Sequence, residues 1–133
     1  MEPSKKSAYD KLQVKAGRKF LLINAPVGMQ ERMGKWPEGA TPLNNDSADL
    51  ADIVQVFVHS QDELNTKLPA AKEKMCDTGM IWITYPKGTG KLKSDIHRDT
   101  IRDFVLGFDL KAVSLISIDD DWSALRVQIP KSK

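Results

Sequence analysis

Residues 52–68, DIVQVFVHSQDELNTKL, hold the pattern that decides the fold. Asp52 to His59 form an apolar run of strand length, and Ser60 to Glu63 form an S-x-x-E capping box that opens a helix. The apolar residues of that helix share one face: Leu64, Leu68, Ala71 and Met75. A strand followed at once by a helix is typical of the βα units from which parallel sheets are built.

Similar units lie on both sides of this one. Residues 19–24, KFLLIN, predict a strand that leads to a short helix, and residues 80–85, MIWITY, predict a third strand. We expect the helix after the third strand to be capped by Ser94 or Asp95. Residues 37–49, PEGATPLNNDSAD, have the composition of a loop.

The C-terminal part of the chain has a different pattern. Residues 111–118, KAVSLISI, and residues 122–129, WSALRVQI, each have strand length, and the acidic residues 119–121 separate them. Apolar and polar residues alternate in the second segment, which is typical of a half-buried antiparallel strand. The sequence therefore predicts a reduced, Rossmann-like α/β fold of two or three layers. Its five-stranded, mostly parallel sheet closes with an antiparallel hairpin.

Length, charge and cysteine content restrict the class of protein. The chain has 133 residues, and we expect one domain over residues 7–130 with flexible tails at 1–6 and 131–133. Its 20 basic and 18 acidic residues give a net charge of +2, without the strong basic excess of nucleic-acid-binding proteins. Cys76 is the only cysteine, and no apolar run reaches the roughly 20 residues that span a bilayer. We expect a cytoplasmic protein that binds neither nucleic acid nor membrane.

Five short segments occur together in one order along the chain. They are NAP at 24–26, VQVFV at 54–58, IWITYPKG at 81–88, DIHRDTIRD at 95–103 and DDDWSALRV at 119–127. Together they resemble a family of small bacterial proteins known only as a domain of unknown function. More distantly, the final hairpin resembles the end of a Rossmann-like methyltransferase fold. That second resemblance implies the strand order 1-2-3-5-4, and likeness of fold does not establish function.

The turn after the first predicted strand differs from the turn in such methyltransferases. There it is glycine-rich, so that the backbone can approach the cofactor, whereas here it reads NAPVG and contains Pro26. Two acidic residues that could hold a ribose, Asp46 and Asp49, lie in a predicted loop rather than at a strand end. We therefore expect no cofactor, and in particular no binding of S-adenosylmethionine.

Ligands of open α/β sheets bind outside the carboxyl ends of the parallel strands. The candidate residues at that edge are Asn24, His59, Ser60, Tyr85, Lys87, Lys91, Asp121 and Trp122. His59 and Ser60 are adjacent and point to opposite faces, and the sequence has no G-x-S-x-G motif, so a hydrolase is not favoured. Two histidines and one cysteine give no zinc-ligand spacing.

Two charged segments at this edge have alternative interpretations. Lys87, Lys91 and Lys93 precede a predicted helix N-terminus and could bind an anion there, or they could belong to a solvated loop before a helix that caps itself. The acidic turn 119–121 could bind a divalent cation, form a plain polar turn, or neutralise Lys87 or Lys91.

These observations favour a non-enzymatic module that binds a small anion or a protein partner. The alternative is a small, methyltransferase-like transferase that uses the same edge. Right-handed crossovers in the order 1-2-3-5-4 would place all three connecting helices on one face of the sheet. Residues 7–14 would then cover part of the other face, and a partner or a second copy the remainder. We expect a monomer or a weak homodimer.

Overall fold

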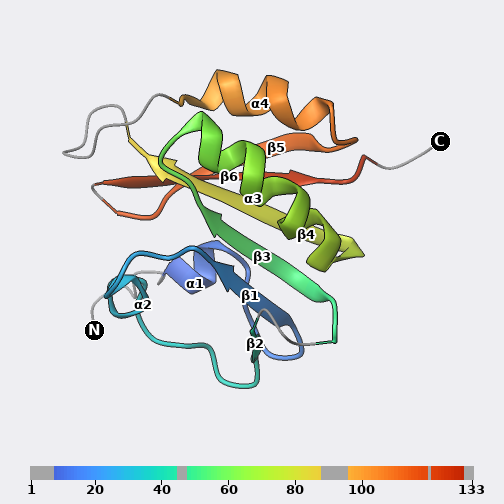
Figure 1. Cartoon of the computed structure of the whole chain (residues 1–133). Coiled ribbons are helices and arrows are strands. Elements are labelled where there is room, and N and C mark those ends of the chain that lie inside the picture. The colour runs from blue at the N-terminus through green and yellow to red at the C-terminus, as the bar shows by residue number, and fades with distance from the viewer. Residues whose placement is uncertain (1–7, 45–47, 88–95, 120, 131–133) are drawn as a thin grey trace.

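A single mixed sheet forms the centre of the molecule (Figure 1). The computed structural model describes residues 8–44, 48–87, 96–119 and 121–130. Its six strands lie in the order β2-β1-β3-β4-β6-β5. In that order they span Thr41–Leu43, Lys19–Ile23, Ala51–Phe57, Met75–Pro86, Trp122–Gln128 and Lys111–Ser117. The first four pair in parallel, and β6 pairs antiparallel with both β4 and β5.

The α/β fold and the order of the five predicted strands are confirmed, but the sheet has six strands, not five. The additional strand, β2, lies inside the segment predicted to be a loop, residues 37–49. It has three residues, one of them Pro42, and so carries no strand pattern of its own. Pairing of Thr41 to Leu43 with the start of β1 makes it a strand.

Helices cover both faces of the sheet. α3, Gln61–Lys74, and α4, Arg98–Leu106, cover one face, which we call the front. α1, Ala8–Lys11, and α2, Met29–Arg32, cover the other face, which we call the back (Figure 1). The prediction of all three connecting helices on one face was wrong. Because β2 lies outside β1, the crossover through α2 runs in the opposite direction, and right-handedness then requires the opposite face.

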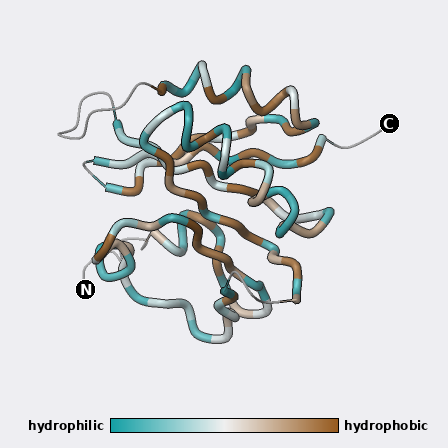
Figure 2. Tube along the Cα trace, in the orientation of Figure 1, coloured by the Kyte–Doolittle hydropathy of each residue, from teal (hydrophilic) through white to brown (hydrophobic). Residues whose placement is uncertain are grey.

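Each face has its own hydrophobic core, and the central strands contribute to both. Figure 2 shows that hydrophobic residues are concentrated along these central strands. In β3, Val54 and Val56 belong to the front core, whereas Ile53 and Phe57 belong to the back core. On the back, Trp82 Nε1 donates a hydrogen bond of 3.0 Å to the carbonyl of Leu12, which fixes the segment after α1 to the sheet. Residues 8–14 therefore cover part of the back face, as the sequence predicted.

The two front helices begin differently. Ser60 is the N-cap of α3, and its Oγ accepts a hydrogen bond of 3.2 Å from the backbone N–H of Glu63, as the capping box predicted. α4 has His97 at its N-cap position, without a side-chain cap, and the predicted caps, Ser94 and Asp95, lie outside the described residues. No helix in the described part of the chain combines the length and apolar character needed to cross a membrane.

Candidate functional site

The carboxyl ends of β1 and β3 are joined by Asn24. Asn24 follows β1 directly and has a positive φ of 63°, a conformation that asparagine tolerates better than most residues. Its Nδ2 donates a hydrogen bond of 2.8 Å to the carbonyl of Phe57, the last residue of β3. The chain therefore turns sharply at this edge and holds the two strand ends together.

His59, Ser60 and Glu63 form a polar cluster beside Asn24. Oε1 of Glu63 accepts a hydrogen bond of 2.5 Å from the backbone N–H of His59 and lies 3.2 Å from Nδ1 of the same residue. Partial burial alone would raise the pKa of Glu63, but hydrogen bonds from the backbone and ring of His59 and from the side chain of Asn24 lower it. This carboxylate thus binds the first turn of α3 to the ends of β1 and β3.

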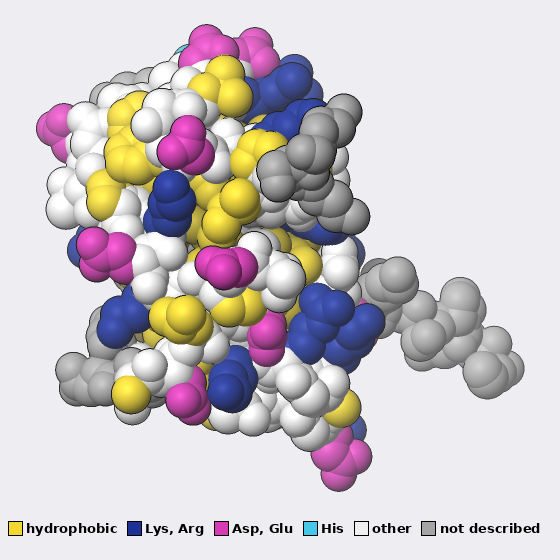
Figure 3. Space-filling view, turned by 90° about the vertical axis from the view of Figure 1, so that its right-hand side faces the viewer, with side chains coloured by type: hydrophobic (Ala, Val, Ile, Leu, Met, Phe, Trp, Pro, Cys, Tyr) yellow, Lys and Arg dark blue, Asp and Glu magenta, His cyan; other side chains and the backbone are white. Residues whose placement is uncertain are grey.

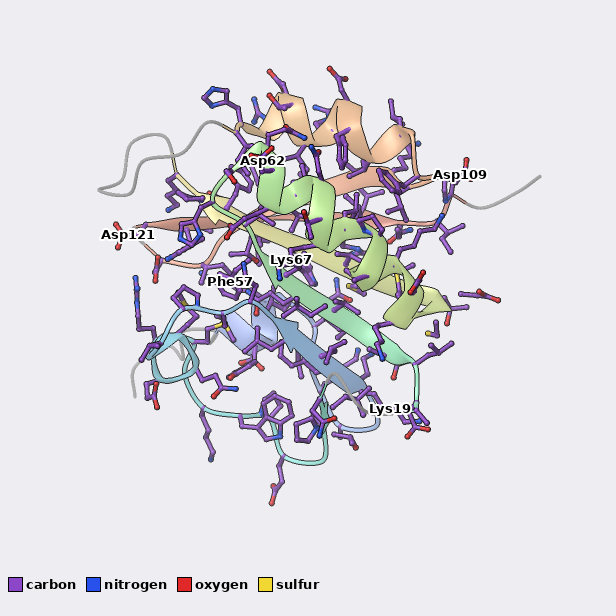
Figure 4. All side chains as sticks on the ribbon, in the orientation of Figure 1. Lys19, Phe57, Asp62, Lys67, Asp109 and Asp121 are labelled. Carbon is purple, nitrogen blue, oxygen red and sulfur yellow. The ribbon has the colours of Figure 1, made fainter. Side chains whose placement is uncertain are left out.

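Trp122 supports this cluster from the back face. Its ring is 1% exposed and meets the rings of Phe57 and His59 edge to face, at centroid distances of 5.1 and 5.2 Å. Asn24, His59, Ser60 and Trp122 therefore lie together, as expected from their places at strand ends. Phe57 and Asp121 are labelled in Figure 4, which shows Asp121 at the tip of the β5–β6 hairpin.

The acidic turn pairs with Arg32 of α2 rather than with Lys87. The guanidinium of Arg32 lies 2.5 Å from a carboxylate oxygen of Asp119 and 3.3 Å from one of Asp121. Lys87 instead donates its backbone N–H to the carbonyl of Asp121 and its Nζ to Oγ of Ser117, at 2.8 and 2.6 Å. The predicted neutralisation of Lys87 by Asp119 or Asp121 was therefore wrong, and its other members, Lys91 and Asp120, lie outside the described residues.

Asp119 also shapes the turn. Its Oδ1 accepts hydrogen bonds from the backbone N–H groups of Asp121 and Trp122, at 2.8 and 3.0 Å. This is the short side-chain-to-backbone pattern of a polar hairpin turn. Within the described ranges, no three or more His, Cys, Asp or Glu side chains are grouped so that they could hold a metal ion.

Tyr85, another predicted edge residue, lies apart from this cluster. Tyr85 belongs to the front core and is 6% exposed, so the sheet separates it from Trp122. Burial raises the pKa of Tyr85, while Arg98 lowers it and Asp99 raises it further. Lys91 lies outside the described residues, as do Lys93, Ser94 and Asp95.

A groove that the sequence did not predict lies at the carboxyl ends of β1 and β2. It contains two adjoining cavities of about 410 and 460 Å³, which share Leu22, Gln30, Glu31 and Leu43. The first extends along the loop after β1, through Pro26 and Gly28, to Asn44 at the end of β2. The second extends under α2 to Trp36. We call this the β1–β2 groove.

The cavity under α2 is lined mainly by apolar surface, whereas the cavity along the loop after β1 exposes more polar than apolar surface. Among the described residues of the lining, Glu31 is the one that carries a charge. Tyr9, Phe20 and Trp36 form an aromatic wall with ring centroids 5.1 to 5.8 Å apart. The groove could not be predicted, because its outer wall is β2. The available signal was the Met29, Met33 and Trp36 stripe: the two methionines are buried in the core, whereas Trp36 faces the cavity.

The loop after β1 leaves space at the mouth of the groove. Val27 is fully exposed, and Gly28 has a φ of 83°, with no atom within 4 Å of the position that a Cβ would take. The positive φ explains a glycine here. Because the space around it is open, the loop leaves a ligand access to the groove.

Solved structures with the same fold include methyltransferases. The chain is similar to a ribosomal protein L11 methylase from Lactobacillus delbrueckii subsp. bulgaricus, with a TM-score of 0.61 and 7% identity, over 93% of this chain and 75% of that one. It is similar to the protein of a DhpI–SAH complex, with a TM-score of 0.60 and 9% identity, over 93% and 83% of the two chains.

A third similar structure is a TehB-like SAM-dependent methyltransferase from Corynebacterium glutamicum, with a TM-score of 0.57 and 9% identity. It is matched over 95% of this chain and 89% of that one. At such low identities these similarities concern the fold alone. No curated protein matches the chain.

The sequence itself matches one family model. The matched residues, 37–131, make up more than half of the chain and include β2 to β6, one wall of the β1–β2 groove and the acidic turn. The chain therefore belongs to the family described as protein of unknown function (DUF3052).

Proposed function

We propose that this protein is a non-catalytic binding module and that its ligand occupies the β1–β2 groove. The observation that carries the proposal is the chemistry of the lining: aromatic and aliphatic side chains, the amides of Gln30 and Asn44, and Glu31 as the one charged group. The cavity under α2 is a largely apolar pocket with a few polar groups, which is the usual form of a small-molecule site, and the adjoining cavity adds polar surface. The ligand that fits is small and mainly apolar, with a neutral or positively charged polar group.

The polar side chains of the neighbouring edge support a binding role rather than catalysis. Asn24 and His59 contact Glu63 and the end of β3, and Arg32 pairs with the acidic turn. These contacts stabilise the fold at the strand ends. Among the described residues of the groove lining there is no histidine, cysteine or lysine, and Glu31 is the one side chain that could act as a base.

A small anion, one of the two kinds of ligand that the sequence favoured beside a protein partner, does not fit this groove, because the described residues of its lining include a carboxylate and no cation. The anion hypothesis depends on the lysines of residues 87–93. Nζ of Lys87 bonds Ser117, and Lys91 and Lys93 lie outside the described residues. Anion binding by that loop stays a prediction that the same titration can test.

The alternative is a small transferase. The similar solved structures favour it, because they include methyltransferases and a complex with SAH. The position of the groove also favours it: β1 has β2 on one side and β3 on the other, and open α/β sheets bind ligands where the strand order reverses in this way. Against it, the loop after β1 contains Pro26, which has no N–H to offer a cofactor.

A ligand titration followed by NMR chemical shifts distinguishes these functions. The probes are S-adenosylmethionine, adenosine, small amphiphilic amines, and phosphate. We expect an amine or a neutral amphiphile to shift residues 22–31 and 43–44. Leu22→Arg, at a back-face residue that lines both cavities, should abolish the shifts, whereas Leu50→Arg, a matched change at an exposed leucine outside the groove lining, should leave them unchanged.

The outcomes separate the alternatives. Saturable binding of S-adenosylmethionine in the micromolar range would favour the transferase and overturn the expectation of no such binding. Chemical shifts that respond to phosphate alone and centre on Lys87 would assign the ligand site to the lysine loop instead of the groove. No response in residues 22–31 to any probe would overturn a small-ligand site in the groove.

A further inference from the structure

The two edges of the sheet are not equally protected. At one edge, β2 has three residues and contains Pro42, which cannot donate a backbone hydrogen bond to another strand. At the other edge, β5 has seven residues, Lys111–Ser117, and no proline. Its backbone pairs with β6 on one side only. An edge strand of this length is a template for pairing with a further strand.

Exposed apolar side chains gather beside β5. Of the six large hydrophobic residues that are exposed in the described part of the chain, four lie around this edge. They are Val113 and Leu115 in β5, Leu106 at the end of α4, and Ile129 directly after β6. Figure 3 shows hydrophobic side chains exposed among charged ones in its upper part, on the side of the molecule where α4 ends. Such a local concentration is typical of an interaction surface.

The sequence of β5 is complementary to itself in antiparallel pairing. With Ser114 at the centre, Val113 lies opposite Leu115 of a second copy. Because the register of β5 against β6 shifts between Ala112 and Ser114, the matched pairing is limited to the part of the strand around Ser114. Lys111 and Ser117 are the two ends of the strand, so the two lysines stay at opposite ends of the pair. Nζ of Lys11 donates to the carbonyl of Ser117 at one end of the strand, away from this centre.

The exposed face of α4 is also complementary to itself. It carries Arg98, Asp99, Arg102 and Asp103. A two-fold axis beside β5 brings α4 and its copy to the same face of the joined sheet in antiparallel orientation. Arg98 then lies towards Asp103 of the copy, and Asp99 towards Arg102. A cavity of about 240 Å³ between α4 and β5 leaves space beside the strand.

We propose that β5 pairs antiparallel with β5 of a second copy of this chain, so that two sheets join across a two-fold axis near Ser114. The contact is isologous, because each copy uses the same strand and the same helix. It lies at the opposite edge of the sheet from the β1–β2 groove and does not depend on the proposed ligand.

Sedimentation equilibrium of the full chain, from micromolar to millimolar concentration, tests the association. We expect a monomer–dimer equilibrium. Val113→Lys places two further cations at the centre of the pair and should raise the dissociation constant by about tenfold or more. Leu50→Lys is the matched control, because Leu50 is similarly exposed, 48% against 43% for Val113, and lies away from β5. Circular dichroism checks that both variants fold.

Cross-linking tests the register. In a Cys76→Ser background, Ser114→Cys should give a covalent dimer with a short bismaleimide, because residues opposite each other in an antiparallel pair lie about 4.5–5.5 Å apart at Cα. Lys111→Cys should not, because the two copies of that residue lie six positions apart along the pair, roughly 20 Å.

A chain that stays monomeric at millimolar concentration would overturn the proposal. A dimer that Val113→Lys and Leu50→Lys weaken equally would also overturn it. So would a dimer in which Lys111→Cys cross-links and Ser114→Cys does not. Weakening by Val113→Lys alone, with cross-linking at Ser114 alone, supports it.

Discussion

The front and back faces of the sheet are covered by different kinds of structure. On the front, α3 and α4 have 14 and 9 residues and present regular apolar stripes. On the back, α1 and α2 have four residues each, so each of these helices covers the sheet with only about one turn. The back core compensates with large aromatic side chains, among them Trp82 and Trp122, both 1% exposed. A face covered by short segments depends on bulky side chains and on contacts between distant parts of the chain.

Deleting residues 1–15 is the largest change we predict. It removes Ala8, Tyr9, Leu12 and Val14 from the back core and leaves the side chain of Trp82 without its hydrogen bond to Leu12. Burial of each large apolar side chain contributes about 1.5–3 kcal/mol, so the loss approaches the total stability of a small domain. We expect a much lower Tm and larger associated species. Thermal unfolding and light scattering measure both, and equal stability and equal size of the intact and truncated chains would contradict this account of the back face.

A matched pair of core substitutions compares the two faces directly. Leu68→Ala in α3 should lower the free energy of unfolding by about 4 kcal/mol, because a long helix held at many points cannot fill the cavity. Met33→Ala, directly after α2, should cost about 2 kcal/mol, because a one-turn segment can move into the space. Both residues are almost fully buried, 0% and 1% exposed, so burial does not explain a difference. Urea denaturation measures the two values, and an equal or larger cost for Met33→Ala would show that the back face is as rigid as the front.

The smallest predicted effect concerns the polar cluster of His59, Ser60 and Glu63 at the start of α3. The pKa of Glu63 is lowered in the folded state, so its carboxylate stabilises the fold above its unfolded pKa, near 4.5, and that contribution is lost as pH falls through the lower folded value. Glu63→Gln should therefore lower Tm at pH 7, and the difference from the wild type should shrink below about pH 4.5.

Thermal unfolding from pH 7 to pH 3 measures that difference. A gap in Tm that stays constant over this range would mean that the charge of Glu63 has no part in holding α3 to the ends of β1 and β3.

The ion pairs of Arg32 with the acidic turn lie at the surface, so salt should weaken their contribution to stability.

The candidate site could be predicted only where local signals were strong. Asn24, His59 and Ser60 come directly after apolar strands. Because the carboxyl ends of parallel strands lie at the same edge of a sheet, the proximity of these residues follows from the strand order. Tyr85 lies within β4, near its end, and the alternation of side chains along the strand directs it to the front face. The partner of the acidic turn, Arg32, lies far away in the sequence, and no local pattern indicates it.

The sequence by itself determined the elements with short-range causes. The apolar runs of β1, β3 and β4, the capping box at Ser60 and the alternation in β6 each reflect interactions among neighbouring residues, and these predicted the fold class. The order of five strands came from the resemblance to a methyltransferase fold. Only the tertiary structure decided that Thr41–Leu43 is a strand, because three residues with a proline gain strand geometry only by pairing with β1. That one pairing reversed the direction of a crossover, moved α2 to the back face and formed the outer wall of the β1–β2 groove. The physical reason is that strand pairing and the face on which a crossover lies depend on where distant segments meet. The pattern of residues within one segment does not encode that meeting point.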